Sequence, residues 1–314
     1  MKTDTFMLTA DDFTHIFVHS WIPEQPNEIK GIVQIAHGMA EHALRYHDFA
    51  TYLVLQGYMV FANDHRGHGK TAGNERNLGI LANTNSWQAV LGDMLMLNRH
   101  IHRLFPDKNI ILLGHSMGSF YARAYLQIYP ETISGIILSG TAWQAPLLLS
   151  TGLAVAKIQC LLKGDDNPSR MLTLLAFAAF NKKIKPIKTP FDWISRDEAI
   201  CRNYTQDALC GFVCSSSFFR ELFRLMKFVH RDDLYGQLNR NFPILILSGT
   251  MDPVGNYGQG PKQMLRFLDK KGFMNMEIKL YPQGRHEMLN EMNRAEVWDD
   301  LREWLGRKVR SNNR

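Results

Sequence analysis

Short apolar runs alternate with longer helical patterns along much of this chain, and the alternation restricts the fold more than any other feature of the sequence. The strands predicted in the first half are Thr14–Trp21, Gly31–Ala36, Met59–Asn63, Asn109–Leu113 and Gly135–Leu138. The later ones are almost wholly apolar, as expected for parallel strands that are covered on both faces. This pattern predicts an α/β fold with a mostly parallel central sheet flanked by helices.

The alternation stops after Thr141 and resumes near Phe242. Residues 142–240 are rich in Phe and Leu, and their pattern is mostly helical. Beyond them we predict the strands Pro243–Leu247 and Met276–Leu280 and helices at Gln259–Lys271 and Ala295–Leu305. We therefore predict a core made of residues 1–141 and 241–314, into which a helical cap of residues 142–240 is inserted.

Composition narrows the class of protein further. Of the 314 residues 45% are apolar and 21% are charged, which is typical of a folded globular chain and excludes a disordered one. The cysteines lack the spacing and the histidine partners of a zinc motif, so we expect reduced packing residues at Cys160, Cys201, Cys210 and Cys214. We predict neither a bound metal nor a cofactor.

Two features of the sequence concern membranes and location. An uncharged run from Thr132 to Ala156 is long enough to span a bilayer, but polar residues and a proline interrupt it. We therefore predict a buried strand, a loop and the beginning of a helix in this run. The N-terminus reaches Asp11 and Asp12 without the apolar segment of a secretion signal, so we expect a cytoplasmic protein, with peripheral membrane contact as an alternative.

Nearly all of the excess positive charge lies in the predicted cap. Residues 141–240 have a net charge of +5, compared with +6 for the whole chain. The basic residues are densest at Lys182, Lys183, Lys185 and Lys188. The simpler interpretation is a solvated connection, and the alternative is a surface attracted to anionic lipids, worth about 1 kcal/mol per cation. No recognition motif accompanies the charge, so we expect no nucleic-acid partner.

A serine flanked by glycines is the strongest local motif. The residues Gly114-His115-Ser116-Met117-Gly118 follow a predicted strand and begin a helical pattern. This context is typical of a nucleophile elbow, a turn so tight that side chains two residues from the serine would clash. We therefore predict Ser116 as a nucleophile, with Gly114, His115 and Gly118 supporting the turn. The alternative is a serine that caps a helix.

A serine nucleophile needs a base and an acid that orients the base. In folds with this elbow the acid and then the histidine follow the serine in the chain, in loops after later strands. Asp252 follows the predicted strand Pro243–Leu247, and His286 follows Met276–Leu280. Because ligand sites in open α/β sheets lie beyond the carboxyl ends of the strands, we predict that the three side chains meet at one rim.

The loop after the predicted strand Gly31–Ala36 supplies the last part of this site. An acyl-transfer enzyme needs two N–H donors for the developing oxyanion. We predict the backbone N–H groups of Met117 and Met39 as these donors, with His37 and Gly38 allowing the chain to turn. The alternative is a glycine-containing turn with structural histidines.

A second histidine-rich loop, Asp64-His65-Arg66-Gly67-His68-Gly69-Lys70, follows the strand Met59–Asn63. It invites a zinc or acid–base interpretation, but no further metal ligand stands out. We interpret it as a structural loop in which Asp64 and Arg66 hold neighbouring backbone in place.

Together these residues resemble the serine α/β-hydrolases, and more narrowly their monoacylglycerol lipase and lysophospholipase branch. The resemblance lies in His37-Gly38-Met39-Ala40-Glu41-His42 with Arg45-Tyr46, Asp64-His65-Arg66-Gly67-His68-Gly69, the serine motif, Ser248-Gly249-Thr250-Met251-Asp252-Pro253-Val254 and Gly284-Arg285-His286-Glu287. It implies the α/β-hydrolase fold, a helical cap over the active site, Ser116 as nucleophile, His286 as base and Asp252 as its orienting acid. It also implies Met39 and Met117 as oxyanion donors. Ser119 departs from the pattern, because many relatives have glycine there.

We predict a serine carboxylic ester hydrolase that cleaves single-chain lipid esters, monoacylglycerols or lysophospholipids, through an acyl-enzyme. Apolar cap residues are candidates to line a slot for one acyl chain, namely Leu172, Leu174, Leu175, Phe177, Phe180, Phe212, Phe218, Phe219 and Phe223. One alternative keeps the same three catalytic residues in a small-ester carboxylesterase or an iminopeptidase-like amidase. Another is a non-catalytic binding protein, since a fold alone does not establish function.

Overall fold

The computed structural model describes residues 1–24, 29–81, 86–231 and 233–311. Within these ranges one sheet of eight strands runs in the order β1-β2-β4-β3-β5-β6-β7-β8. The strands are β1 (Lys2–Thr9), β2 (His15–Ile22), β3 (Gly31–Ala36), β4 (Tyr58–Asn63), β5 (Ile110–His115), β6 (Gly135–Ser139), β7 (Ile244–Gly249) and β8 (Met276–Tyr281). β2 is antiparallel to both of its neighbours, and all pairs from β4 to β8 are parallel. The prediction of a mostly parallel sheet is therefore confirmed.

Alternating side chains of the central strands supply two separate hydrophobic cores. In β5, Ile110 and Leu112 belong to one core while Ile111 and Leu113 belong to the other. Successive side chains of a strand point to opposite faces, so a strand that is apolar throughout can be buried only between two layers. This explains why the apolar runs of the sequence predicted these strands with ends within two residues of those observed.

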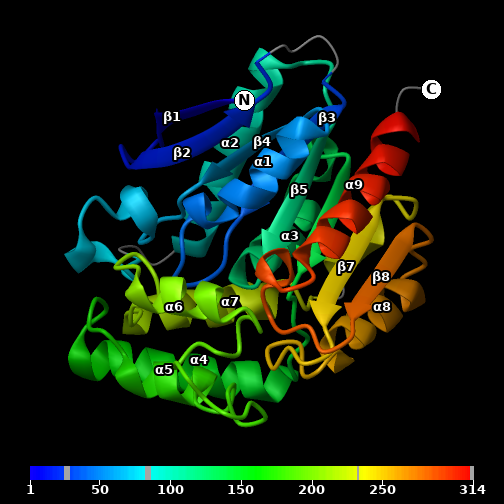
Figure 1. Ribbon diagram of the computed structural model, residues 1–314. Helices are drawn as coiled ribbons and strands as arrows, with labels where there is room; N and C mark the ends of the chain where they lie inside the picture. The colour runs from blue at the N-terminus through cyan, green and yellow to red at the C-terminus, as the bar shows by residue number, and fades with distance from the viewer. Residues whose placement is uncertain (25–28, 82–85, 232, 312–314) are drawn as a thin grey trace.

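Helices cover both faces of the sheet (Figure 1). On one face, α1 (His47–Leu55) and α9 (Arg294–Ser311) contribute to one core, and on the other, α2 (Ser86–Leu104), α3 (Met117–Ile128) and α8 (Gln259–Lys270) contribute to the second. Short 3₁₀ turns complete the connections: η2 (Ala43–Tyr46), η3 (Gly69–Ala72), η4 (Glu75–Asn77), η5 (Pro130–Thr132), η6 (Asp233–Gln237) and η7 (Met288–Asn290).

Between β6 and β7 the chain forms α4 (Pro146–Lys163), α5 (Arg170–Phe177), α6 (Glu198–Gln206) and α7 (Ser216–Phe228). These helices gather at the end of the sheet towards which β7 points (Figure 1). α7 packs against α4 on one side and against α2 and α3 on the other. The carboxyl ends of the parallel strands therefore face these helices, which is where the sequence places Ser116, Asp252 and His286.

The run from Thr132 to Ala156 contains β6, a loop and the beginning of α4, as predicted. Among the described helices, α4 is the one whose length and composition would allow it to cross a membrane, and 17% of this stretch is buried. Its buried residues, Leu149, Ala156 and Gln159, form one side of the helix.

The N-terminal strand β1 was not predicted. It is an edge strand that pairs with β2, and its side chains are mostly exposed, with Phe6 and Leu8 half-buried against the core. A strand of this kind has no apolar run, because its hydrogen bonds to β2 rather than burial hold it in place. The periodicity that identifies buried strands is therefore absent from its sequence.

Candidate active site

Ser116 lies at the sharp turn between β5 and α3. Its backbone has φ 53° and ψ −118°, a left-handed conformation that costs a non-glycine residue about 1–3 kcal/mol. The flanking glycines make the turn possible, since a Cβ on Gly114 would lie 2.3 Å from the carbonyl oxygen of Gly118, and one on Gly118 would lie 2.0 Å from that of Ala36. The turn has the geometry expected of a nucleophile elbow, with the strain located at the serine.

Asp252 and His286 come together from the loops after β7 and β8. The Nδ1 of His286 donates to Oδ1 of Asp252 at 3.0 Å. Both residues are buried, His286 with 2% and Asp252 with 0% exposure. Because Nδ1 carries the hydrogen of this bond, Nε2 is left as the basic nitrogen of the neutral ring. Ser116 and His286 both line a cavity of about 270 Å³. The structure thus brings the three residues to one rim of the sheet.

The charge of Asp252 sets the basicity of His286. Burial by itself lowers the pKa of His286, but the adjacent Asp252 carboxylate opposes this effect and outweighs it, so the pKa is raised above 6.5. Burial alone would raise the pKa of Asp252, because it favours the neutral acid. The neighbouring imidazole favours the carboxylate, and the pKa is lowered below its ordinary value. His115, whose ring centroid lies 4.7 Å from that of His286, has its pKa lowered to about 4 by burial and by His286. His286 is therefore the ring of this pair that gains a proton first.

The loop after β3 forms the wall of the cavity beside Ser116. Gly38 approaches so closely that a Cβ there would lie 3.2 Å from Cβ of Ser116, and Met39 lines the cavity. Ala40 has a positive φ of 54°, and its carbonyl accepts hydrogen bonds from Gly211 N–H and from the hydroxyl of Tyr204. Bonds from two other segments thus hold the conformation of this loop.

Met117, the other predicted oxyanion donor, opens α3 and also has a buried side chain. The first N–H groups of a helix have no partner within the helix, so α3 itself does not use this amide. Ser119, the departure from the family pattern, donates its hydroxyl hydrogen to the carbonyl of Ser116 at 2.6 Å, and its oxygen lies 2.8 Å from the hydroxyl of Thr141, so the group is satisfied.

A buried ion cluster links the β3 loop to the loop of His286, and sequence reasoning missed it. Arg45 donates to Glu41 at 2.6 Å and to the two oxygens of Glu287 at 2.6 and 2.7 Å. The hydroxyl of Tyr46 also donates to Glu41, at 2.9 Å. Charges this deep are stable only when paired, so each member requires the others. The four residues stand in the motifs that carry the family resemblance, but Glu287 lies 242 positions from Arg45, so spacing along the chain does not reveal the whole cluster.

One wall of the cavity is apolar and comes from residues between β6 and β7. Of the nine side chains predicted to line an acyl slot, Leu174, Phe177 and Phe212 do so. Most of the others pack elsewhere; Leu172, Phe218 and Phe219, for example, are buried in the core. The sequence did not predict the lining residues Phe191, Trp193, Ile194 and Tyr204. The first three come from an irregular segment, and Tyr204 lies on the short amphipathic helix α6.

The loop after β4 is structural, as predicted for Asp64. The Asp64 carboxylate accepts the N–H groups of Ala43 at 2.9 Å and Lys70 at 2.7 Å. The prediction for Arg66 was wrong: its guanidinium pairs with the carboxylates of Asp12 and Asp93 instead of holding backbone. Both carboxylates are remote in the sequence, and a buried guanidinium finds its strongest partners in such groups.

The histidine rings of the two loops lie against one another, tilted or edge-on, and the rings of His37 and His68 bond to backbone. His37 donates through Nδ1 to Gly38 O and accepts His65 N–H at Nε2, while His68 accepts Ala40 N–H. Burial lowers the pKa of His68 to about 3, and it lowers the pKa of His65 well below the ordinary value. His65 and His68 are therefore neutral rings that support the β3 loop.

The sheet order and the placement of a serine after β5 and of a histidine–aspartate pair after β8 and β7 define a serine hydrolase of the α/β-hydrolase fold. The chain belongs to the family described as "Serine aminopeptidase, S33", whose model matches residues 27–293.

Individual relatives are similar over almost the whole chain. A monoacylglycerol lipase of Mycolicibacterium smegmatis is 29% identical and covers 91% of this chain and 90% of its own. A monoglyceride lipase of Rattus norvegicus is 24% identical over 96% of this chain and 90% of its own. The crystal structure of a thermostable carboxyl esterase from Bacillus coagulans in complex with glycerol superposes with a TM-score of 0.90 at 27% identity, covering 98% of this chain and 99% of that one.

Proposed function

We propose that this enzyme hydrolyses esters of single-chain lipids, monoacylglycerols or lysophospholipids, with Ser116, His286 and Asp252 as its catalytic residues. The observation that carries the proposal is the buried His286–Asp252 pair, whose histidine lines the same cavity as a serine held in a strained turn. The relatives named monoacylglycerol and monoglyceride lipases support the substrate class.

In this mechanism Ser116 attacks the ester carbonyl while Nε2 of His286 takes the hydroxyl proton. The imidazolium, stabilised by Asp252, then gives the proton to the leaving alcohol, and an acyl-enzyme on Ser116 results. Water activated by His286 next attacks the acyl carbonyl and releases the fatty acid. No step requires a metal or a cofactor.

The backbone N–H groups of Met39 and Met117 would stabilise the oxyanion formed at each attack. Met39 lines the cavity and Met117 begins α3 next to the nucleophile. Removal of one such donor typically costs about 10²–10³ in rate, so the fixed conformation of the β3 loop matters for turnover. The bonds from Tyr204 and Gly211 to Ala40 hold that loop.

The cavity has a lining of two chemical kinds, which fits a lipid with a small polar head. Glu41, Tyr204 and Glu287 supply polar groups, and Leu174, Phe177 and Trp193 supply apolar surface. Specific sites of this kind combine an apolar lining with a few polar groups that fix orientation. One acyl chain against the apolar wall would place the ester beside Ser116 and the alcohol near the acidic groups.

We also propose that residues 142–240 act as a cap whose outer face rests on a lipid surface. α4 carries a stripe of strongly exposed apolar side chains, in which Leu147 is 80%, Leu161 85% and Leu162 78% exposed. The opposite side of α4 is buried against α7, so a helix lying in the interface fits better than one that crosses the membrane.

The basic run at 182–188 is less suited to membrane contact. Lys188 pairs with Glu198, and the ammonium of Lys183 lies 3.5 Å from the ring centroid of Tyr257. These contacts favour the simpler interpretation of the run as a connection within the cap.

The proposal is tested by comparing turnover of long-chain monoacylglycerol, lysophospholipid, short acyl esters and prolyl amides at fixed salt and detergent. We expect the single-chain lipids to give the highest kcat/KM, and Ser116→Ala to abolish turnover without unfolding the protein. A fluorophosphonate probe should label the wild type and leave Ser116→Ala unlabelled. A preference for the shortest esters or for prolyl amides would overturn the lipid assignment, and labelling of the variant would overturn the nucleophile.

A further inference from the structure

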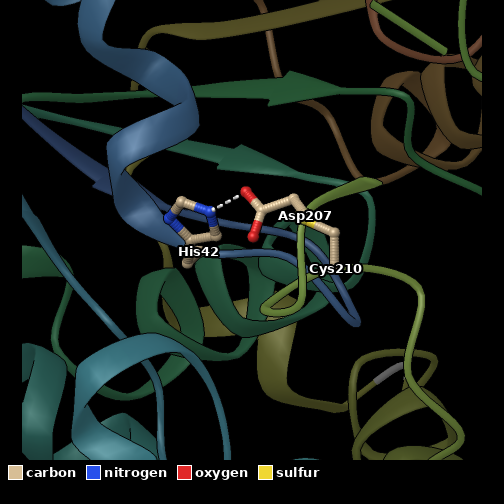
Figure 2. A group of neighbouring side chains, drawn as sticks. All are labelled: His42, Asp207 and Cys210. Atoms are coloured by element: carbon tan, nitrogen blue, oxygen red, sulfur yellow. Dashed lines mark hydrogen bonds and ion pairs between the residues drawn. The ribbon is translucent and has the colours of Figure 1, made fainter. Parts of the chain in front are cut away.

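A group of three potential metal ligands lies just outside the cavity. Figure 2 shows His42, from the loop after β3, facing Asp207 and Cys210, from the segment after α6. The Nε2 of His42 lies 2.9 Å from Oδ2 of Asp207, and the ligand atoms of all three residues lie within 4.8 Å of one another. His42 and Asp207 are 165 positions apart in the chain, which is why cysteine and histidine spacing gave no sign of the group.

We propose that His42, Asp207 and Cys210 form a binding site for Zn²⁺ that joins the β3 loop to the cap. An imidazole, a thiolate and a carboxylate are the donors that zinc prefers, whereas Mg²⁺ and Ca²⁺ select oxygen ligands. Three protein ligands leave the fourth tetrahedral position for water, and the Asp207 side chain, 36% exposed, opens the site to solvent on one side.

The geometry needs a small contraction to enclose an ion. Zinc bonds of about 2.0–2.3 Å place tetrahedral ligand atoms roughly 3.3–3.8 Å apart. The His42–Asp207 pair is closer than this and Cys210 is within 4.8 Å, so an ion would separate the first two slightly and draw the sulfur inwards. A zinc ion would take the place of the Cys210 thiol proton, because only the thiolate binds the metal.

The site lies outside the cavity, because none of its three ligands lines it. Its neighbours in the chain do: Ala40 and Glu41 precede His42, and Gly211 follows Cys210. Two hydrogen bonds to the Ala40 carbonyl, from Gly211 N–H and the Tyr204 hydroxyl, already connect the same two segments. An ion at His42, Asp207 and Cys210 would replace the direct His42–Asp207 contact with three metal bonds and stabilise the folded protein by mass action.

Titration of the metal-free protein with Co²⁺ tests the site without reference to catalysis. We expect one equivalent to give a thiolate-to-cobalt charge-transfer band in the near ultraviolet and the strong visible bands of a tetrahedral ion, both removed by Zn²⁺. Zn²⁺, but not Mg²⁺, should raise the melting temperature. The absence of a charge-transfer band in the wild type would overturn the proposal.

Variants assign the ligands. Cys210→Ser should remove the charge-transfer band and weaken Zn²⁺ binding by about tenfold or more, since even outer residues of metal sites contribute that much. The matched control is Cys160→Ser on α4, a half-buried free cysteine outside the group, which should bind as the wild type does. If Cys210→Ser does not fold, Asp207→Asn at the more exposed ligand should keep the band and lose affinity. The assignment would be overturned if Cys210→Ser kept the charge-transfer band or if Cys160→Ser lost it. It would also be overturned if Asp207→Asn bound the metal with unchanged affinity.

Discussion

At the scale of single residues, the balance of forces on His286 decides whether Ser116 can be activated. Burial favours the neutral ring and Asp252 favours the charged one, and the net result is a raised pKa. A base must be neutral to accept the serine proton, so activity should fall as the pH decreases through this pKa. The acid limb of the rate profile is therefore expected above pH 6.5.

Asp252→Asn should lower kcat by about 10⁴-fold, because the amide no longer fixes the productive tautomer or stabilises the imidazolium. Loss of the carboxylate charge also removes the main influence that raises the pKa of His286, so the acid limb should move to lower pH. The measurement is kcat/KM against pH for wild type and variant on one soluble ester. Near-normal turnover, or an acid limb that stays in place, would show that Asp252 does not orient His286.

At the scale of elements, the loop of His286 is held by a short segment between α5 and α6. His286 N–H donates to Trp193 O and Glu287 N–H donates to Ile194 O at 2.7 Å. Glu291 is completely buried, and its carboxylate accepts the N–H groups of Arg196 and Arg285 and the guanidinium of Arg196 at 2.9 Å. This part of the insertion is therefore built into the active site.

We expect Glu291→Gln to lower the free energy of unfolding by about 1–3 kcal/mol, because an amide NH₂ replaces one acceptor and faces buried N–H groups. It should also lower kcat more than it changes KM, since the residue positions the His286 loop and does not touch the cavity. Chemical denaturation and steady-state kinetics measure the two effects. Glu296→Gln, an exposed carboxylate on α9, is the control. Equal behaviour of the two variants would contradict a positioning role for Glu291.

Features that depend on residues close together in the chain were predicted, and features that depend on residues far apart in the chain were missed. Buried strands and the serine turn are set by neighbours in the chain, so periodicity and glycine spacing revealed them. The Arg45–Glu287 contact joins residues 242 positions apart, and no local pattern reports it. The positions of Ser116, Asp252 and His286 could be predicted, because each follows a strand in a known order along the chain. The apolar wall with Trp193 could not be predicted, because irregular segments have no hydrophobic periodicity.

At the scale of the whole molecule, the core and the insertion expose different kinds of surface. The helices on the sheet turn their apolar sides to the two cores, whereas α4 turns its most apolar side to solvent. A contiguous row of exposed apolar side chains on one helix is typical of a surface that contacts another molecule or a membrane. Because α4 lies beyond the carboxyl ends of the parallel strands (Figure 1), docking through it would bring the cavity close to a lipid surface.

The double variant Leu161→Ser, Leu162→Ser should adsorb to phospholipid vesicles at least about tenfold more weakly than the wild type, because full burial of one leucine contributes about 1.5–3 kcal/mol. Turnover of a short soluble ester should be unchanged, since neither side chain lines the cavity. The matched control is the double variant Leu55→Ser, Met274→Ser. It removes two similarly exposed side chains, with 76% and 71% exposure, that lie outside the insertion of residues 142–240. Vesicle sedimentation at fixed salt compares the two. If both double variants adsorb equally, docking through α4 is contradicted, and if only the α4 variant is impaired, the orientation of the enzyme on lipid follows from the side on which α4 lies.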